Sequence, residues 1–189
     1  MTVGASAGQR DRARGALVGL AVGDALGMPA QMLTRDRVAG LWGRIRGFET
    51  GPAESEIAPL MPAGRVTDDT DQAVILAELL LAGGGYVDPE AFARRLLDWE
   101  SHLVARGSLD LLGPSTKRAV EAFRAGTAVT ATGRWGDTNG AAMRVAPVGV
   151  LMPADPVAAL AERVAHVNEV THNTGVANAG ASAVATPVL

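Results

Sequence analysis

Two adjoining stretches decide the fold: the polar run Val66-Thr67-Asp68-Asp69-Thr70-Asp71-Gln72, and the apolar run Ala73-Val74-Ile75-Leu76-Ala77-Glu78-Leu79-Leu80-Leu81-Ala82 that follows it directly. The second run is apolar on almost every side of a helix, and such a helix is buried among other elements. Carboxylates at a helix start lie where free N–H groups and the helix dipole favour negative charge. The sequence therefore predicts a central, buried helix over 67–82 with a strongly acidic start.

The rest of the chain also has helical rather than alternating apolar periodicity, with short Gly/Pro loops between Ala/Leu-rich runs. Further helices are expected at 10–26, 88–104, 114–125, 140–151, 156–170 and 174–186, with ends uncertain by roughly two to four residues. Residues 43–64 are expected to form a long irregular loop, either a functional lid or a plain surface excursion. The predicted fold class is all-α, a compact multi-helix bundle that forms one domain over residues 1–189.

Composition excludes several functions. The 189 residues are 48% hydrophobic and 20% charged, enough for one globular domain with a sizeable core. A net charge of -3 lacks the basic excess of nucleic-acid binding proteins, so no nucleic acid partner is expected. The absence of cysteine excludes disulfides and thiolate chemistry. The polar opening residues lack the apolar core of a secretory signal, and no run approaches the roughly 20 residues of a membrane helix, so we expect a cytoplasmic location and no membrane contact.

A glycine stripe marks the first predicted helix, because Gly15, Gly19, Gly23 and Gly27 recur at four-residue intervals and share nearly one face. Glycine inside a helix costs up to about 1 kcal/mol of stability relative to alanine. Tight packing against another helix or the approach of a ligand is therefore expected to offset the cost of the four glycines. Asp24 lies beside it. Buried aspartate is rare unless paired, and two interpretations are open: a cap on a neighbouring helix, or a part of a ligand site.

The acidic cluster at Thr67, Asp68 and Asp69 exceeds what capping requires. Capping accounts for one of these residues, whereas two adjacent carboxylates beside a buried helix repel each other unless a cation or solvent intervenes. A hydroxyl and two carboxylates would supply half of the octahedral oxygen shell of Mg²⁺, which usually retains waters. The residues alone leave both a well-capped helix and a metal site open.

Four segments occur in an order typical of one protein family: Gly15–Gly27, Thr67–Thr70, Thr138–Gly149 and Val170–Thr174. Together they resemble the ADP-ribosylglycohydrolase family, which includes dinitrogenase reductase-activating glycohydrolase, over nearly the whole chain. Each motif alone is unspecific, and the ordered set is specific. The resemblance implies an all-α fold and a magnesium-dependent site with one or two Mg²⁺ ions, or Mn²⁺ in their place.

The resemblance also assigns roles to residues. The resemblance implies that Thr67, Asp68 and Asp69 are ligands of the metal that binds the ribose hydroxyls. The 138–140 turn would approach ribose and phosphates through its amides, a chemistry that suits phosphate. Without the resemblance, we would interpret His172 as a cap or a satisfied polar group. Residues expected to bind an ADP-ribose-like ligand are Asp24, Gln31, Thr138, Asn139, Gly140, His172 and Asn173. Next to them, Met143 is interpreted as core filling, and Arg144 is open between a site role and a surface charge.

Two features depart from the family pattern. Gln31 stands where the family often carries a glutamate. An amide cannot exchange a proton, so the catalytic work would fall to Asp69 or Asp68, acting on a water. Relatives complete their metal site with an Asp-rich motif in a C-terminal region, and no such motif follows His172. We therefore expect a C-terminally incomplete member of the family, completed by a missing half or by another subunit.

Three functions follow as hypotheses. The first is a magnesium-dependent glycohydrolase that cleaves an ADP-ribosyl or related ribosyl glycosidic bond. The second is a non-catalytic relative that binds ADP-ribose or metal, which Gln31 and the absent motif favour. The third is an inactive truncated remnant, since a fold alone does not confer activity. The sequence leaves open whether the chain is an enzyme.

Overall fold

Helices account for the regular structure of the chain in a computed structural model that describes residues 6–106, 112–152 and 155–186. No strand occurs in these residues, which confirms the predicted all-α fold. In chain order the helices are α1 (Ala7–Gly27), η1 (Met28–Ala30), α2 (Arg35–Trp42), α3 (Asp68–Ala82), α4 (Pro89–Ala105), α5 (Pro114–Arg124), α6 (Val129–Thr132), α7 (Gly140–Met143), α8 (Ala146–Leu151), α9 (Val157–Asn168) and α10 (Gly175–Ala185).

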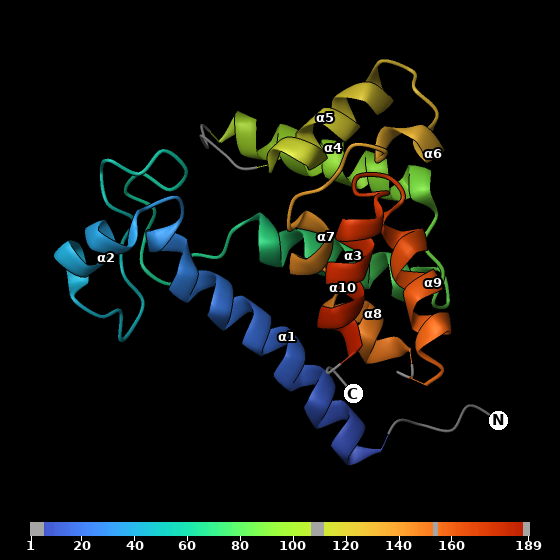
Figure 1. Cartoon of the computed structure of the whole chain (residues 1–189), viewed down its shortest axis with the longest axis horizontal. Coiled ribbons are helices and arrows are strands. Elements are labelled where there is room, and N and C mark those ends of the chain that lie inside the picture. The colour runs from blue at the N-terminus through green and yellow to red at the C-terminus, as the bar shows by residue number, and fades with distance from the viewer. Residues whose placement is uncertain (1–5, 107–111, 153–154, 187–189) are drawn as a thin grey trace.

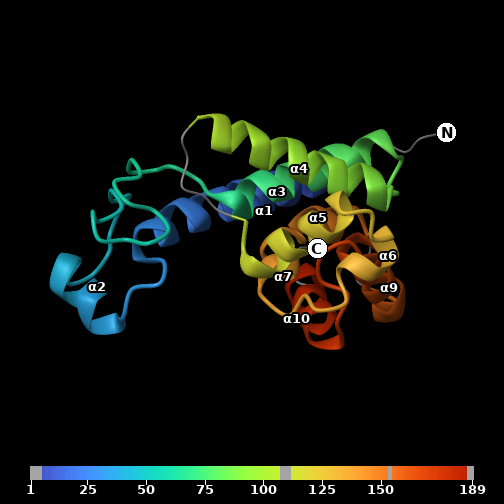
Figure 2. The same cartoon turned by 90° about the horizontal axis from the view of Figure 1, so that it is seen from above.

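Helix α3 is central, as its sequence predicts. It packs against α1, α4, α7 and α8, and Leu76 and Leu80 are almost completely buried in the core. Phe92 and Leu96 of α4 and Val164 of α9 belong to the same core. Seen from above, α1, α3 and α4 run along one edge, while α7, α9 and α10 lie together beneath them (Figure 2). The start of α3 therefore lies where several helices meet.

One segment lies apart from this core. Helix α2 and the loop that follows it project to one side of the bundle (Figure 1). Residues 43–67 contain no helix, as predicted for most of this range. In the part of the chain that the structure describes, no single helix is long and apolar enough to cross a membrane. The segments Ala7–Ala30 and Arg35–Trp42 reach that length and composition only as a pair bent by 94°.

The prediction of one helix over 140–151 is wrong. Helix α7 ends at Met143 and α8 begins at Ala146. Pro147 has no N–H to bond to the carbonyl of Met143, four residues earlier, so a continuous helix is disfavoured here. The break places Arg144 in the interior, where it is 0% exposed. The short elements η1, α2 and α6 were not predicted, whereas the other predicted helices agree with the structure to within three residues at each end.

The glycine stripe of α1 is not tightly packed. A Cβ atom added to Gly15, Gly19, Gly23 or Gly27 would have no neighbour within 4 Å among the described residues, the helix's own nearby backbone apart. Close helix packing, the first explanation that the sequence suggests, is therefore absent from this part of the structure. Gly23 and Gly27 instead line a pocket, which agrees with the second explanation, the approach of a ligand.

Candidate functional site

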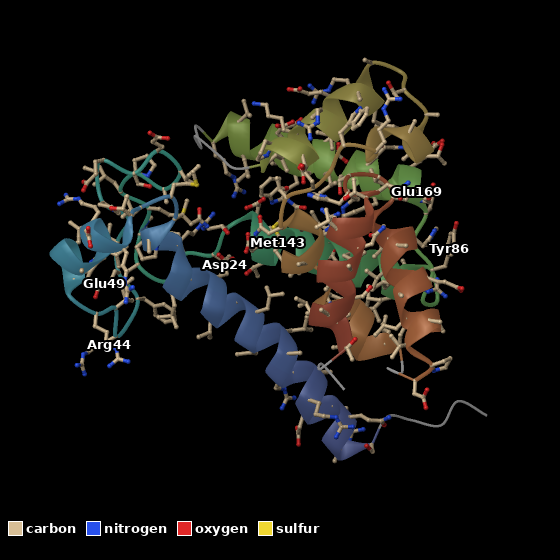
Figure 3. The ribbon with its side chains drawn as sticks, viewed as in Figure 1. Asp24, Arg44, Glu49, Tyr86, Met143 and Glu169 are labelled. Carbon is tan, nitrogen blue, oxygen red and sulfur yellow. The ribbon has the colours of Figure 1, made fainter. Side chains whose placement is uncertain are left out.

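A pocket of about 740 Å³ brings together residues from distant parts of the sequence. This volume lies within the roughly 300–1,000 Å³ of small-molecule sites. Its walls come from the end of α1, the starts of α3 and α5, and the 138–140 turn before α7. Figure 3 shows Asp24 on α1 and Met143 on α7, both of which line the pocket. The predicted site residues that line it are Asp24, Gln31, Asp68, Asp69, Thr138, Asn139 and Gly140.

Asp24 caps the start of α3. Its Oδ2 accepts hydrogen bonds from the backbone N–H of Thr67 at 2.8 Å and of Thr70 at 3.2 Å, and from the Thr70 hydroxyl at 2.6 Å. Its Oδ1 accepts from the Thr67 hydroxyl at 2.8 Å. Of the two interpretations of Asp24, capping is thus confirmed, and the carboxylate also lines the pocket. It fixes the end of α1 against the acidic helix start.

Asp68 and Asp69 are held in an unfavourable electrostatic environment. Burial raises the pKa of Asp68 to about 7, and the charges of Asp69 and Asp24 add to this effect, while a backbone hydrogen bond from Gly113 opposes it. Burial, followed by the charge of Asp24, also raises the pKa of Asp69. Neither carboxylate forms an ion pair within the described residues. The two carboxylates thus lie together at the pocket with no ion pair among these residues, although the charge of Arg144 acts to lower the pKa of Asp68.

A hard dication such as Mg²⁺ fits this pair of carboxylates, because its charge would offset both the burial and the mutual repulsion. The described residues hold no group of three or more His, Cys, Asp or Glu side chains placed to bind a metal. The Thr67 hydroxyl donates to Asp24, and Thr67, only 3% exposed, does not line the pocket. Asp68 and Asp69 would therefore be the protein ligands, with oxygens of water and of the bound ligand completing the shell.

A buried chain of hydrogen bonds joins the acidic cluster to the 138–140 turn. The Gln72 side-chain amide donates to Asp68 Oδ2 at 3.0 Å, and Arg144 Nη1 donates to Gln72 Oε1 at 2.9 Å. Arg144 Nη2 donates to the Thr171 hydroxyl oxygen, which lies 2.9 Å from His172 Nδ1. Beyond these five residues, His172 Nε2 lies 3.0 Å from Thr138 Oγ1, at the pocket wall.

His172 lies behind the pocket wall. The side chain is 0% exposed and both ring nitrogens have hydrogen-bond partners. Burial lowers its pKa to about 3, and the charges of Arg144 and Arg118 add to this effect. A Cβ at position 140 would lie 2.6 Å from the His172 Cε1 atom, so Gly140 allows the ring to approach the turn. Asn173 is exposed and does not line the pocket, and its backbone N–H donates to the Gly133 carbonyl at 2.8 Å.

Sequence reasoning missed the middle of the hydrogen-bond chain, formed by Gln72, Arg144 and Thr171. Two signals pointed to it. Gln72 lies one helical turn after Asp68 on a helix that is otherwise apolar, and Pro147 interrupts the predicted helix just after Arg144. A surface charge, one of the two interpretations of Arg144, is excluded by its complete burial.

Comparison with known proteins bears on the ancestry of this site. The family model described as ADP-ribosylglycohydrolase matches residues 5–188. The chain belongs to the ADP-ribosylglycohydrolase family. Membership confirms the resemblance of the four sequence segments, three of which contribute directly to the pocket.

The relatives that the chain matches are longer than the chain. It is 41% identical over 175 residues to Uncharacterized protein YegU of Escherichia coli (strain K12), covering 93% of this chain and 52% of that protein. It is 34% identical over 164 residues to ADP-ribosyl-[dinitrogen reductase] glycohydrolase of Rhodospirillum rubrum, covering 86% and 52%. A solved structure titled ADP-ribosylglycohydrolase-related protein complex matches with a TM-score of 0.71 and 32% identity, covering 94% of this chain and 54% of that one. The chain spans about half the length of the curated relatives it matches.

Proposed function

We propose that the chain forms one wall of the active site of a magnesium-dependent glycohydrolase, which cleaves an ADP-ribosyl or related ribosyl glycosidic bond. One observation carries the proposal. Asp24, the pair Asp68 and Asp69, and the 138–140 turn come from separate family segments, and all of them line a single pocket.

The acidic wall suits the ribose end of the ligand. Mg²⁺ held by Asp68 and Asp69 would supply the positive charge that orients the ribose hydroxyls. Asp68 Oδ2 already accepts from Gln72, whereas the Asp69 side chain has no hydrogen-bond partner among the described residues. Asp69 is therefore the better placed of the two to accept a proton from the water that attacks the anomeric carbon.

The other walls suit phosphate groups. Asn139 and Lys117 both line the pocket and are exposed, and neither side chain has a hydrogen bond or ion pair among residues 6–106, 112–152 and 155–186. The eleven-residue helix α5 begins at this wall after Gly113, with no side-chain cap on its first N–H groups. Free N–H groups and a cationic side chain favour an anionic ligand group. We expect the remaining protein ligands to come from a second half of the fold or from another subunit.

A non-catalytic binding role is the second candidate, and Gln31 favours it. Gln31 lines the pocket at a position where the resemblance leads us to expect a glutamate. Its amide can orient a ligand hydroxyl or a water but cannot act as an acid or a base. In that case the pocket would bind an ADP-ribose-like ligand without cleaving it.

One experiment separates these candidates. The full chain is incubated with Mg²⁺ and ADP-ribosylated dinitrogenase reductase, and both ADP-ribose release and ADP-ribose binding are measured. Release that is lost in Asp69→Asn supports the hydrolase, and binding without release supports the alternative. Asp71→Asn is the matched control, because Asp71 lies on the same turn of α3 but accepts from Trp99 Nε1 at 2.9 Å and does not line the pocket. Absence of both binding and release would refute both candidates.

A further inference from the structure

Arg144 sets the direction of the buried hydrogen-bond chain, because a guanidinium group can donate but cannot accept. Toward the acidic cluster, Arg144 Nη1 donates to Gln72 Oε1, which turns the amide nitrogen of Gln72 toward Asp68. Asp68 Oδ2 must therefore accept. In the other direction, Arg144 Nη2 donates to the hydroxyl oxygen of Thr171.

The Thr171 hydroxyl, which accepts from Arg144, in turn determines which ring nitrogen of His172 carries the proton. The Thr171 hydroxyl hydrogen has one acceptor among the described residues, His172 Nδ1 at 2.9 Å. In the reverse arrangement, with Nδ1–H as the donor, the hydroxyl hydrogen of a 0% exposed residue would have no acceptor, which folded proteins avoid. A neutral imidazole with an accepting Nδ1 carries its proton on Nε2. His172 Nε2–H then donates to Thr138 Oγ1 at 3.0 Å.

At Thr138 the chain of hydrogen bonds reaches the pocket. The hydroxyl oxygen receives the hydrogen bond of His172, and its own hydrogen has no acceptor within the described parts of the protein. Thr138 is partly exposed and lines the pocket. Its O–H group is therefore available to donate to a bound molecule.

We propose that Arg144 is a positioning residue that fixes the hydrogen-bond polarity of the pocket, so that Thr138 faces the ligand as a donor and Asp68 faces it as an acceptor. The subsite at Thr138 takes an acceptor oxygen of the ligand, which receives the free hydroxyl hydrogen. The inference rests on the proposed function in taking this pocket as the ligand site, while the polarity itself follows from contacts within the protein.

The tautomer of His172 tests the polarity directly, without any ligand. Long-range ¹⁵N–¹H NMR distinguishes the two ring nitrogens, and the chain has three histidines, so His102→Asn and His166→Asn identify the signals of His172. We expect the Nε2–H tautomer in the wild type and in Thr171→Ser, and mixed tautomers in Thr171→Val, which has the shape of threonine but no hydroxyl. An Nδ1–H tautomer in the wild type overturns the proposal.

The same spectrum tests the part assigned to Arg144. Glutamine can accept from the Thr171 hydroxyl as well as donate to it, so Arg144→Gln is expected to mix the tautomers. Arg144→Lys, which can only donate, is expected to restore the Nε2–H form. A purely structural Arg144 predicts no change of tautomer in any variant that folds, and this result would overturn the assignment. If neither Arg144 variant folds, the tautomer of His172 in the wild type, in Thr171→Ser and in Thr171→Val still tests the hydrogen-bond polarity.

Binding of ADP-ribose, measured by calorimetry, tests the donor at Thr138. We expect Thr138→Val to weaken binding by about tenfold, the effect of losing one good hydrogen bond, and Thr138→Ser to restore it. Equal affinities for the valine variant and the wild type overturn the donor role of Thr138. An Nε2–H tautomer in a protein that binds no ADP-ribose supports the polarity set by Arg144 and refutes the proposed function, so the two failures are distinguishable.

Discussion

Removal of the Asp24 carboxylate should destabilise the protein strongly, because this side chain connects α1 to the start of α3. In Asp24→Ala, the backbone N–H groups of Thr67 and Thr70 both lose their acceptor. The hydroxyls of the same two residues can rotate toward other acceptors, but the N–H groups cannot. The stability change therefore depends mainly on these two N–H groups.

The magnitude follows from that count. A partly buried N–H without a partner costs about 1–3 kcal/mol, so two of them cost roughly 4 kcal/mol. Loss of the Asp24 charge also relieves Asp68 and Asp69, whose pKa values it raises, and this offsets a part of the cost. We expect a net loss of about 3 kcal/mol, or a fall of roughly 6–12 °C in Tm for a chain of this size. Asp24→Asn keeps one acceptor oxygen and should lose about 1 kcal/mol.

Urea denaturation followed by circular dichroism measures these differences. Asp36→Ala is a suitable control, because Asp36 also lies in the first turn of a helix but is exposed and has no hydrogen bond within the described residues. Its change should be within about 0.5 kcal/mol. If Asp24→Ala is no less stable than this control, the carboxylate does not hold the start of α3, and the account of Asp24 is wrong.

Three further perturbations address other parts of the structure. Gly19→Ala should stabilise the chain by about 0.5–1 kcal/mol in urea denaturation, because a Cβ there meets nothing within 4 Å; destabilisation would show that the face is packed. Gly140→Ala should cost about 1–3 kcal/mol, since its Cβ would lie 2.6 Å from His172 Cε1, and an unchanged stability would contradict the position of the ring. Protonation of His172 favours the unfolded chain, because its folded pKa of about 3 is below the ordinary 6.5. Its stabilising contribution is complete above pH 6.5 and is lost as the pH falls toward 3, so from pH 6.5 to 4.5 the wild type should lose about 2 kcal/mol relative to His172→Asn. Parallel pH profiles for the two proteins would count against a buried, neutral His172, and the exposed His102→Asn is the control.

The features that sequence reasoning predicted are those with local causes. The helix over 67–82 follows from an apolar run preceded by capping residues, and both signals lie within a few turns of one another. The two carboxylates of Asp68 and Asp69 are adjacent in sequence, so their mutual repulsion could be predicted from the sequence, and burial and neighbouring charges do raise the pKa of both. The family segments predicted that Asp24 and the 138–140 turn belong to the same site, and the pocket brings them together.

The features that it missed depend on contacts between distant segments. Whether the Thr67 hydroxyl binds a metal or Asp24 depends on how α1 crosses α3, which no local pattern encodes. The burial of Arg144 depends on the break before Pro147 and on partners 24 to 72 residues away. Arginine is mostly exposed unless paired, so the residue type alone could not exclude a surface position for this side chain. Likewise, the sequence left open whether the α1 stripe is offset by helix packing or by a ligand, because the choice depends on helices whose positions the sequence does not reveal.

The most direct test of the account is a calorimetric titration of Mg²⁺ into the wild type, into Asp71→Asn and into the double variant Asp68→Asn with Asp69→Asn. We expect saturable binding at millimolar concentration or below in the first two proteins, and its loss in the double variant. Absence of binding in the wild type, or binding that is unchanged when both carboxylates are removed, would contradict the claim that these partly buried carboxylates form a dication site.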